Sequence, residues 1–246
     1  MTRVNPIRRL LVACDLSEHG LAALKAAATL ASRTHAELSG LFVEDEDFVR
    51  FAGLSSARVF HAGSTAAMRP DVAAMERELR ASAERVRLAT ARVAEQVGIP
   101  WSFRVVRGRV TEVVLAAGVE ADVIVLGRAG PTPRADPATG STARKVAVDA
   151  PSSVLLMRRG EEVRGPFVVA DDRSPAAERA RALAEQLAQG GDGTIRVRTV
   201  PAADAGSLLS ALRTDDAGTV FVPASADLEG LIDRLDEVPC PVWIVR

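Results

Sequence analysis

The sequence predicts an α/β fold in which a mainly parallel sheet is built twice along the chain. Three observations lead to this prediction. Short apolar runs alternate with longer amphipathic segments, runs such as VIVL and VLLM are apolar without interruption, and the order of the elements recurs in the second half. Uninterrupted apolar strands suit a parallel sheet that helices cover on both faces. We therefore expect strands joined by right-handed helical crossovers.

The first half alternates strand and helix signals throughout. The expected strands span residues 7–14, 36–43, 101–106, 122–127 and 152–158, and the expected helices span residues 18–34, 71–98, 110–119 and 141–149. In the longest helix, apolar residues recur at steps of three and four, and Gly98 and Pro100 mark its end. Residues 44–70 are polar and irregular, and we expect no regular element there.

The second half repeats the first in a shortened form. Three pairs of segments correspond, namely 166–188 with 7–31, 195–223 with 103–127, and 240–246 with 151–159. The charged segment 159–165 has the character of a linker, and the second copy lacks an equivalent of residues 36–98. The sequence therefore predicts a domain over residues 1–158, a linker over 159–165 and a smaller domain over 166–246.

The composition is that of an ordinary globular protein. Of the 246 residues, 48% are hydrophobic and 26% are charged, and the formal net charge is −1. Because there is no basic excess, we expect no nucleic-acid partner. No apolar run approaches the roughly 18 residues of a membrane span, and the N-terminal run ends at Asp15 without a cleavage-site pattern. We therefore expect a cytoplasmic protein without a membrane partner.

A glycine-containing loop, GRAGPTPRADPATGST, follows the fourth strand at residues 127–142. It has the spacing G-x2-G-x9-G-S, at Gly127, Gly130, Gly140 and Ser141. Glycines let the backbone approach phosphate oxygens closely. Gly140, Ser141 and Thr142 also fall at an expected helix start, where free N–H groups and the helix dipole favour an anion. The loop therefore predicts a phosphate-binding site.

Asp15 is expected at the same edge of the sheet, because ligands of open parallel sheets bind at the carboxyl ends of the strands. Its carboxylate would accept a hydrogen bond from a ribose hydroxyl or support Mg²⁺. Simpler interpretations stay open for all these residues. The first two glycines are typical of a turn and the third, with Ser141, of a helix N-cap. Asp15 is typical of a cap for a helix over residues 17–33.

Other polar groups of the sequence predict no catalytic residue and no metal site made of protein ligands. Cys14 and Cys240 lie in apolar runs and form no CxxC pair. The three histidines lack ligand spacing; they are His19, His35 and His61.

The middle of the loop is less suited to an anion than its ends. Three prolines each remove a backbone donor, and Asp136 adds a negative charge. We interpret Arg128 and Arg134 as loop arginines that either offset this charge or stay solvated.

The glycine spacing, the strand VIVLG before it, the strand PSSVLLMRR after it and the opening ACDLSEHG resemble the universal stress protein family. The resemblance covers residues 1–158 and, as a trimmed copy, residues 165–246. It implies a parallel sheet of order 3-2-1-4-5 and an ATP site. Adenine would lie near Val43, with Ala13 lining the same pocket, and the ribose near Asp15. The phosphates would be held by Gly127, Gly130, Gly140, Ser141 and Thr142.

Members of this family commonly dimerise by pairing their fifth strands antiparallel. The resemblance implies the same contact within one chain, between residues 152–158 and 240–246, which would make an intrachain pseudo-dimer. A further homodimer stays open. The second copy lacks the glycine spacing, and we expect it to bind no nucleotide.

The leading hypothesis is a tandem universal stress protein that binds ATP, with or without Mg²⁺, in its N-terminal copy. Hydrolysis is expected to be slow or absent, because the sequence indicates no base to orient water and no second acidic metal ligand. The alternative is a regulatory protein–protein interaction module of the same fold without nucleotide, which the prolines and Asp136 favour. A third, weaker option is an adenine nucleotide α-hydrolase, although the sequence shows no catalytic constellation for it. ATP, AMP and other ligands are not distinguished.

Overall fold

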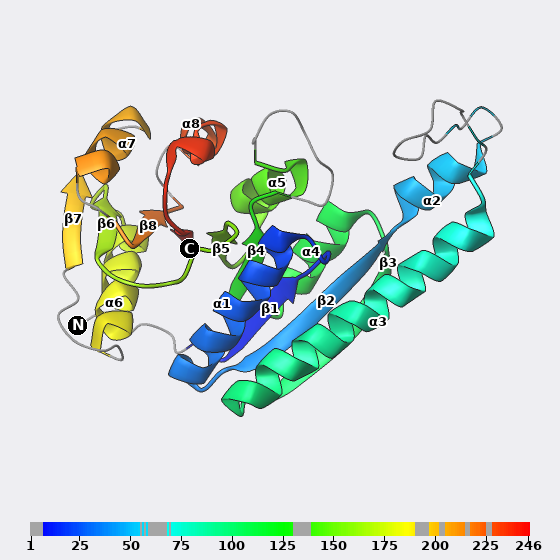
Figure 1. Cartoon of the computed structure of the whole chain (residues 1–246). Coiled ribbons are helices and arrows are strands. Elements are labelled where there is room, and N and C mark those ends of the chain that lie inside the picture. The colour runs from blue at the N-terminus through cyan, green and yellow to red at the C-terminus, as the bar shows by residue number, and fades with distance from the viewer. Residues whose placement is uncertain are drawn as a thin grey trace.

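The structure, a computed structural model, places helices on both faces of one sheet (Figure 1). It describes residues 7–54, 56, 58, 68, 70–129, 139–189, 197–201, 205–214, 217–224 and 228–246. The strands are β1 Arg9–Ala13, β2 Glu37–Asp45, β3 Trp101–Gly108, β4 Val123–Gly127, β5 Ser153–Met157, β6 Phe167–Asp171, β7 Val197–Pro201, β8 Thr219–Pro223 and β9 Val242–Val245. The helices are α1 Glu18–Thr34, α2 Glu46–Gly53, α3 Val72–Val97, α4 Val110–Gly118, α5 Ser141–Asp149, α6 Pro175–Gln189, α7 Ala205–Thr214 and α8 Leu228–Asp233, followed by a 3-10 turn at Leu235–Glu237.

The described strands form a nine-stranded sheet of order β3-β2-β1-β4-β5-β9-β8-β6-β7. The first half has the order 3-2-1-4-5 with parallel pairing throughout, as predicted. The strands of the second half are also parallel to one another. There β7 lies beside β6, in the position that β2 takes beside β1, so the second half extends the sheet by four strands.

An antiparallel pair, β5 with β9, joins the two halves of the sheet. Val154, Leu155 and Leu156 face Ile244, Trp243 and Val242, respectively. All six side chains are fully buried. This antiparallel pairing lies within the two ranges, 152–158 and 240–246, between which a contact was expected.

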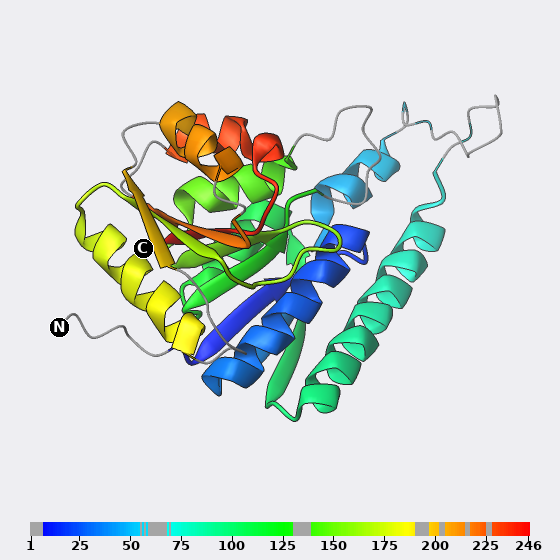
Figure 2. The same cartoon turned by 60° about the vertical axis from the view of Figure 1, so that its left-hand side comes forward.

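Two apolar cores, one on each face of the sheet, both extend across the halves. Helices α1, α3 and α6 cover one face, and α4, α5, α7 and α8 cover the other (Figures 1 and 2). On the first face, Trp243 stacks on Phe221 with ring centroids 5.4 Å apart, and Leu155 belongs to the same core. Full burial of one such aliphatic side chain stabilises the fold by roughly 1.5–3 kcal/mol. The cores thus give the halves a shared source of stability.

The helix boundaries follow from local capping. Asp71 accepts a hydrogen bond from the Ala74 N–H at 3.1 Å to begin α3, and Gly98 ends it with φ of 70°. Such a left-handed residue at a helix end favours glycine. The expectation that residues 44–70 hold no regular element is wrong, because α2 begins directly after its N-cap Asp45. This helix has only eight residues, fewer than the roughly 11 residues over which helical periodicity is read.

A turn of the same geometry occurs in each half of the chain. After β1, Leu16 has φ of 64°, and after β6, Arg173 has φ of 62°. In the first turn the Ser17 N–H donates to Asp15 Oδ1 at 3.0 Å, and in the second the Ser174 N–H donates to Asp172 Oδ1 at 2.9 Å. Each serine then caps the following helix.

None of the helices in the described ranges is both long and apolar enough to pass through a membrane.

Candidate functional site

The carboxyl edge of the first half of the sheet brings Ala13, Val43 and Gly127 to one side of the molecule. Ala13, the last residue of β1, lies beside Leu41 in β2 and Leu126 in β4, and β2 continues past it to Asp45. The side chains of Ala13 and Val43 are half-buried and pack against the same core, on the α4 and α5 face. Together they form a small apolar surface at the strand ends.

Asp15 lies just beyond β1 and is exposed. Its Oδ1 accepts the Ser17 N–H at 3.0 Å, and Ser17 in turn accepts the Gly20 N–H at 2.9 Å as the N-cap of α1. A Cβ at Gly20 would lie 2.6 Å from Asp15 Oδ1. The carboxylate therefore sits over the first turn of α1, where the helix dipole favours a negative charge. The cap of α1 is Ser17, not Asp15.

Gly127, at the end of β4, lies in close contact with the backbone of helix α1. A Cβ added there would lie 2.7 Å from the His19 carbonyl carbon and 2.9 Å from the Gly20 nitrogen. Real Cβ atoms do not approach backbone so closely, so α1 packs on β4 only because this residue is glycine. The packing of the fold requires this glycine whether or not a ligand binds.

The two ends of the loop after β4 lie together. We call the backbone of Arg128 and Gly140 the loop neck. The Arg128 N–H donates to the Met157 carbonyl at 2.7 Å, and the Gly140 N–H donates to the Arg128 carbonyl at 2.7 Å. The neck places Gly127 close to the start of α5. Gly130 lies outside the described residues, as does the proline-rich middle of the loop.

The N-terminus of α5 has the features of an anion site. Gly140 is its N-cap, with φ of −60° and no side-chain cap, and the first turn holds no acidic residue. Ser141 is exposed and Thr142 half-buried. Thr139, just before the cap, is only 3% exposed, and its hydroxyl makes no hydrogen bond within the described part of the chain. Unused N–H and O–H donors thus gather at one helix start.

Arg128 does not behave as a solvated or ligand-facing loop arginine, which is how the sequence was interpreted. Its side chain is 2% exposed and donates to backbone carbonyls of the second half. Burial lowers the pKa of Arg128 to about 10, so the guanidinium remains charged at neutral pH. No sequence signal indicates such partners, because any residue type supplies a backbone carbonyl.

The Cys14 thiol at this edge of the sheet is buried. Burial raises the pKa of Cys14 to about 11, so it stays protonated at neutral pH. Across the described ranges, no group of three or more His, Cys, Asp or Glu side chains is arranged to hold a metal ion. The donors at this edge are suited to binding an anion.

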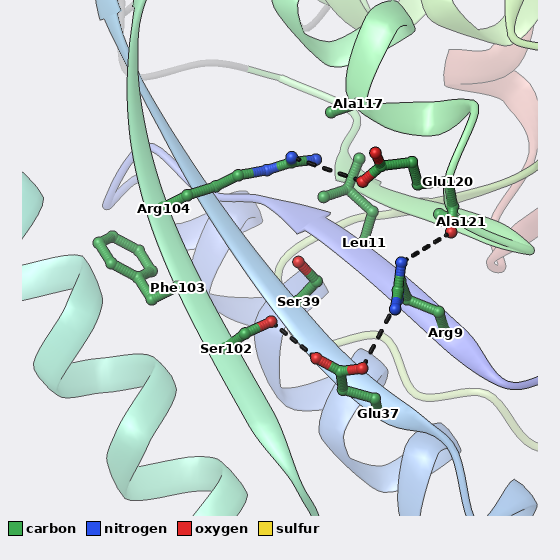
Figure 3. Close-up of a pocket in the computed structure, with 10 residues that line it drawn as sticks. All are labelled: Arg9, Leu11, Glu37, Ser39, Ser102, Phe103, Arg104, Ala117, Glu120 and Ala121. Atoms are coloured by element: carbon green, nitrogen blue, oxygen red, sulfur yellow. Dashed lines mark hydrogen bonds and ion pairs between the residues drawn. The ribbon is translucent and has the colours of Figure 1, made fainter.

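A cavity of about 220 Å³ lies at the opposite edge of the sheet, where β1, β2 and β3 begin (Figure 3). Its charges are paired with one another. Arg9 Nε lies 3.6 Å from Glu37 and Arg104 lies 3.7 Å from Glu120, while the Ser102 hydroxyl donates to Glu37 at 2.9 Å. Because the two carboxylates balance the two guanidinium groups, this hollow does not favour a phosphate. The carboxyl edge remains the better candidate.

Comparisons with known proteins agree with this architecture. The sequence model of the universal stress protein family matches residues 6–158. The crystal structure of a universal stress protein from Archaeoglobus fulgidus DSM 4304 is 18% identical with a TM-score of 0.69, covering 97% of this chain and 96% of that one. A functionally unknown protein from Pseudomonas aeruginosa PAO1 is 12% identical with a TM-score of 0.56, covering 97% and 92%. At such identities the likeness concerns the fold alone. The search of curated proteins gave no match.

Proposed function

Because the chain belongs to the universal stress protein family, we propose that it binds Mg-ATP at the carboxyl edge of its first half and hydrolyses it slowly or not at all. The adenine would contact Ala13 and Val43, and the ribose would approach Asp15. The phosphates would be held by Gly127, Gly130, Gly140, Ser141 and Thr142. The loop neck is the observation that carries this proposal, because it gathers two of the glycines of the spacing beside one helix start.

The start of α5 supports the phosphate part of the proposal. Its first-turn N–H groups and the Ser141 and Thr142 hydroxyls are donors at the positive end of the helix dipole. No acidic residue of the first turn opposes an anion. The Thr139 hydroxyl, buried and without a partner among the described residues, adds a further donor next to this start. The donor set therefore suits phosphate oxygens.

Asp15 supports a limited role for the metal ion. One carboxylate oxygen is engaged with the Ser17 N–H, which leaves the other for a ribose hydroxyl or a water of hydrated Mg²⁺. Mg²⁺ commonly keeps several waters and is held by one carboxylate together with the substrate phosphates. Bound Mg²⁺ would offset the negative charge of the phosphates. This chain would contribute one contact to the ion, from Asp15 through a bound water.

Slow or absent hydrolysis follows from the groups at this edge. Phosphoryl transfer requires a residue that orients the attacking water. Asp15 is assigned to the ribose or to a water of hydrated Mg²⁺, and Cys14 is held protonated by burial. Neither is set to orient a water at the end of a phosphate chain, so we expect a binding protein rather than an efficient ATPase.

The second half, in this proposal, replaces a partner subunit and binds no nucleotide. Its β9 pairs with β5 through three residue pairs, as the fifth strand of a second subunit would. The helix after β8, α8, has only six residues, and no glycine spacing precedes it. We accordingly propose a domain over 1–158, a linker over 159–165 and a smaller domain over 166–246, in a cytoplasmic protein.

An alternative function, a regulatory protein–protein interaction module without nucleotide, is favoured by a different observation. Helix α2 exposes two aromatic side chains, Phe48 at 50% and Phe51 at 48%. Exposed apolar clusters mark interaction surfaces. Isothermal titration with Mg-ATP separates the two functions. Saturable binding to one site per chain supports the nucleotide proposal, and no heat at millimolar ATP supports the interaction module.

A further inference from the structure

We propose that Arg128 is a positioning residue through which the second half holds the neck of the ligand loop in place. This inference rests on the proposed function for its ligand, but its physical basis is the set of contacts that Arg128 makes. The backbone of Arg128 is part of the loop, and its side chain contacts the second half.

The backbone of Arg128 fixes both ends of the loop. Its N–H donates to the Met157 carbonyl in β5, and its carbonyl accepts the Gly140 N–H, both at 2.7 Å. Gly127 precedes it directly, and α5 begins one residue after Gly140. A shift of Arg128 therefore moves the glycine at one end of the loop relative to the helix start at the other.

The side chain of Arg128 is held by segment 235–240, which leads from the 3-10 turn towards β9. Its guanidinium donates to the carbonyls of Leu235 at 3.1 Å, Val238 at 2.9 Å and Cys240. Glu161 lies 4.0 Å away and balances the charge. A buried guanidinium is costly unless such acceptors surround it. The conformation of segment 235–240 and the position of Arg128 are therefore mutually dependent.

A second contact ties the other end of the loop to the same region. Arg144 in α5 pairs with Asp233 in α8, the helix just before the 3-10 turn. Helices α5 and α8 lie side by side (Figure 2). Since both ends of the loop are attached to residues 233–240, the second half acts on the site even though it carries no glycine spacing of its own. By thermodynamic linkage, a ligand that binds the loop must also stabilise this segment.

Two variants test the inference. Arg128→Met removes the donors with little change in volume, and Arg33→Met is the matched control. Arg33 also donates to a carbonyl of the second half, Leu187 at 2.6 Å, but on the opposite face of the sheet. Amide exchange of Gly140, followed by NMR without ligand, should become about tenfold faster in Arg128→Met, the factor for loss of one hydrogen bond, and change little in Arg33→Met.

The second readout is the affinity for Mg-ATP, measured by titration calorimetry on the folded variants. We expect Arg128→Met to weaken it about tenfold and Arg33→Met to leave it unchanged. If Arg128→Met does not fold, Arg128→Lys, which keeps the charge but not the planar donor set, replaces it. Equal effects of the Arg128 and Arg33 variants, or wild-type exchange and affinity in the Arg128 variant, would overturn the inference. Faster exchange with undiminished affinity would also overturn it.

The exchange experiment separates this inference from the proposed function. If the wild-type chain binds no Mg-ATP, the proposed function fails. The amide exchange of Gly140 then tests the present inference by itself. Faster exchange in Arg128→Met but not in Arg33→Met then still supports the attachment of the loop neck to the second half. Equal exchange rates in the two variants contradict it.

Discussion

Gly127 at the end of β4 lies directly against the backbone of His19 in α1, where a Cβ would come within 2.7 Å of the His19 carbonyl carbon. The same glycine is the first of the loop spacing. The packing of α1 on β4 therefore requires glycine at this position, whether or not a ligand binds.

Gly127→Ala should destabilise the protein without any ligand present. The added methyl meets rigid backbone, and such overpacking costs roughly 1–3 kcal/mol. Gly53→Ala is the control, because a Cβ there meets open space at the end of α2 and should change stability by about 1 kcal/mol or less. Urea unfolding of the two variants measures the difference. Wild-type stability of Gly127→Ala would show that α1 does not pack on β4 in this way.

Asp15→Asn should weaken Mg-ATP binding without unfolding the turn. The amide oxygen still accepts the Ser17 N–H, but the negative charge is lost. We expect affinity to decrease about ten- to a hundredfold, the range for one hydrogen bond that involves a charged group. Asp172→Asn, in the equivalent turn of the second half, is the matched control and should leave affinity unchanged. Equal losses in the two variants, or none in Asp15→Asn, would exclude a ligand role for Asp15.

The two halves should unfold together, because both cores extend across β5 and β9. The two tryptophans, Trp101 in β3 and Trp243 in β9, lie in different halves. Variants Trp101→Phe and Trp243→Phe each leave one fluorescent probe. In each variant, the urea midpoint measured by tryptophan fluorescence should coincide with the midpoint measured by circular dichroism. Two separated fluorescence transitions would mean that the halves are independent domains.

Stability should decrease at alkaline pH through the two buried thiols. Burial raises the pKa of Cys14 to about 11 and that of Cys240 to about 12, above the unfolded value of 9.0. The unfolded chain therefore releases these protons first. The thiols leave stability unchanged below about pH 9 and reduce it as the pH rises through the folded values. Above about pH 9, the unfolding free energy should fall less steeply with pH in the double variant Cys14→Ala/Cys240→Ala than in the wild type. Identical slopes in the two proteins would contradict the raised pKa values of the thiols.

The parts of the fold that depend on local pattern were predictable from the sequence. Helices α1 and α5 coincide with the predicted ranges 18–34 and 141–149. The antiparallel β5–β9 contact is not local, and only the resemblance to the family implied it. Helix α2 was missed because eight residues give too few turns for a clear period.

The candidate site was less predictable, since its glycines and charges depend on distant backbone. The packing of Gly127 against His19 and the burial of Arg128 against carbonyls more than a hundred residues away leave no spacing in the sequence. The glycine pattern indicated the position of the loop, but not what holds its neck closed.

Titration of Mg-ATP into the wild type, Gly140→Asp and Gly140→Ala determines whether an ATP site lies at the start of α5. Gly140 has φ of −60°, which any residue adopts, and aspartate is a good N-cap, so both variants should fold. We expect saturable binding by the wild type, similar binding by Gly140→Ala, and at least about tenfold weaker binding by Gly140→Asp, whose carboxylate occupies the anion position. No binding by the wild type at millimolar ATP, or undiminished binding by Gly140→Asp, would contradict an ATP site there.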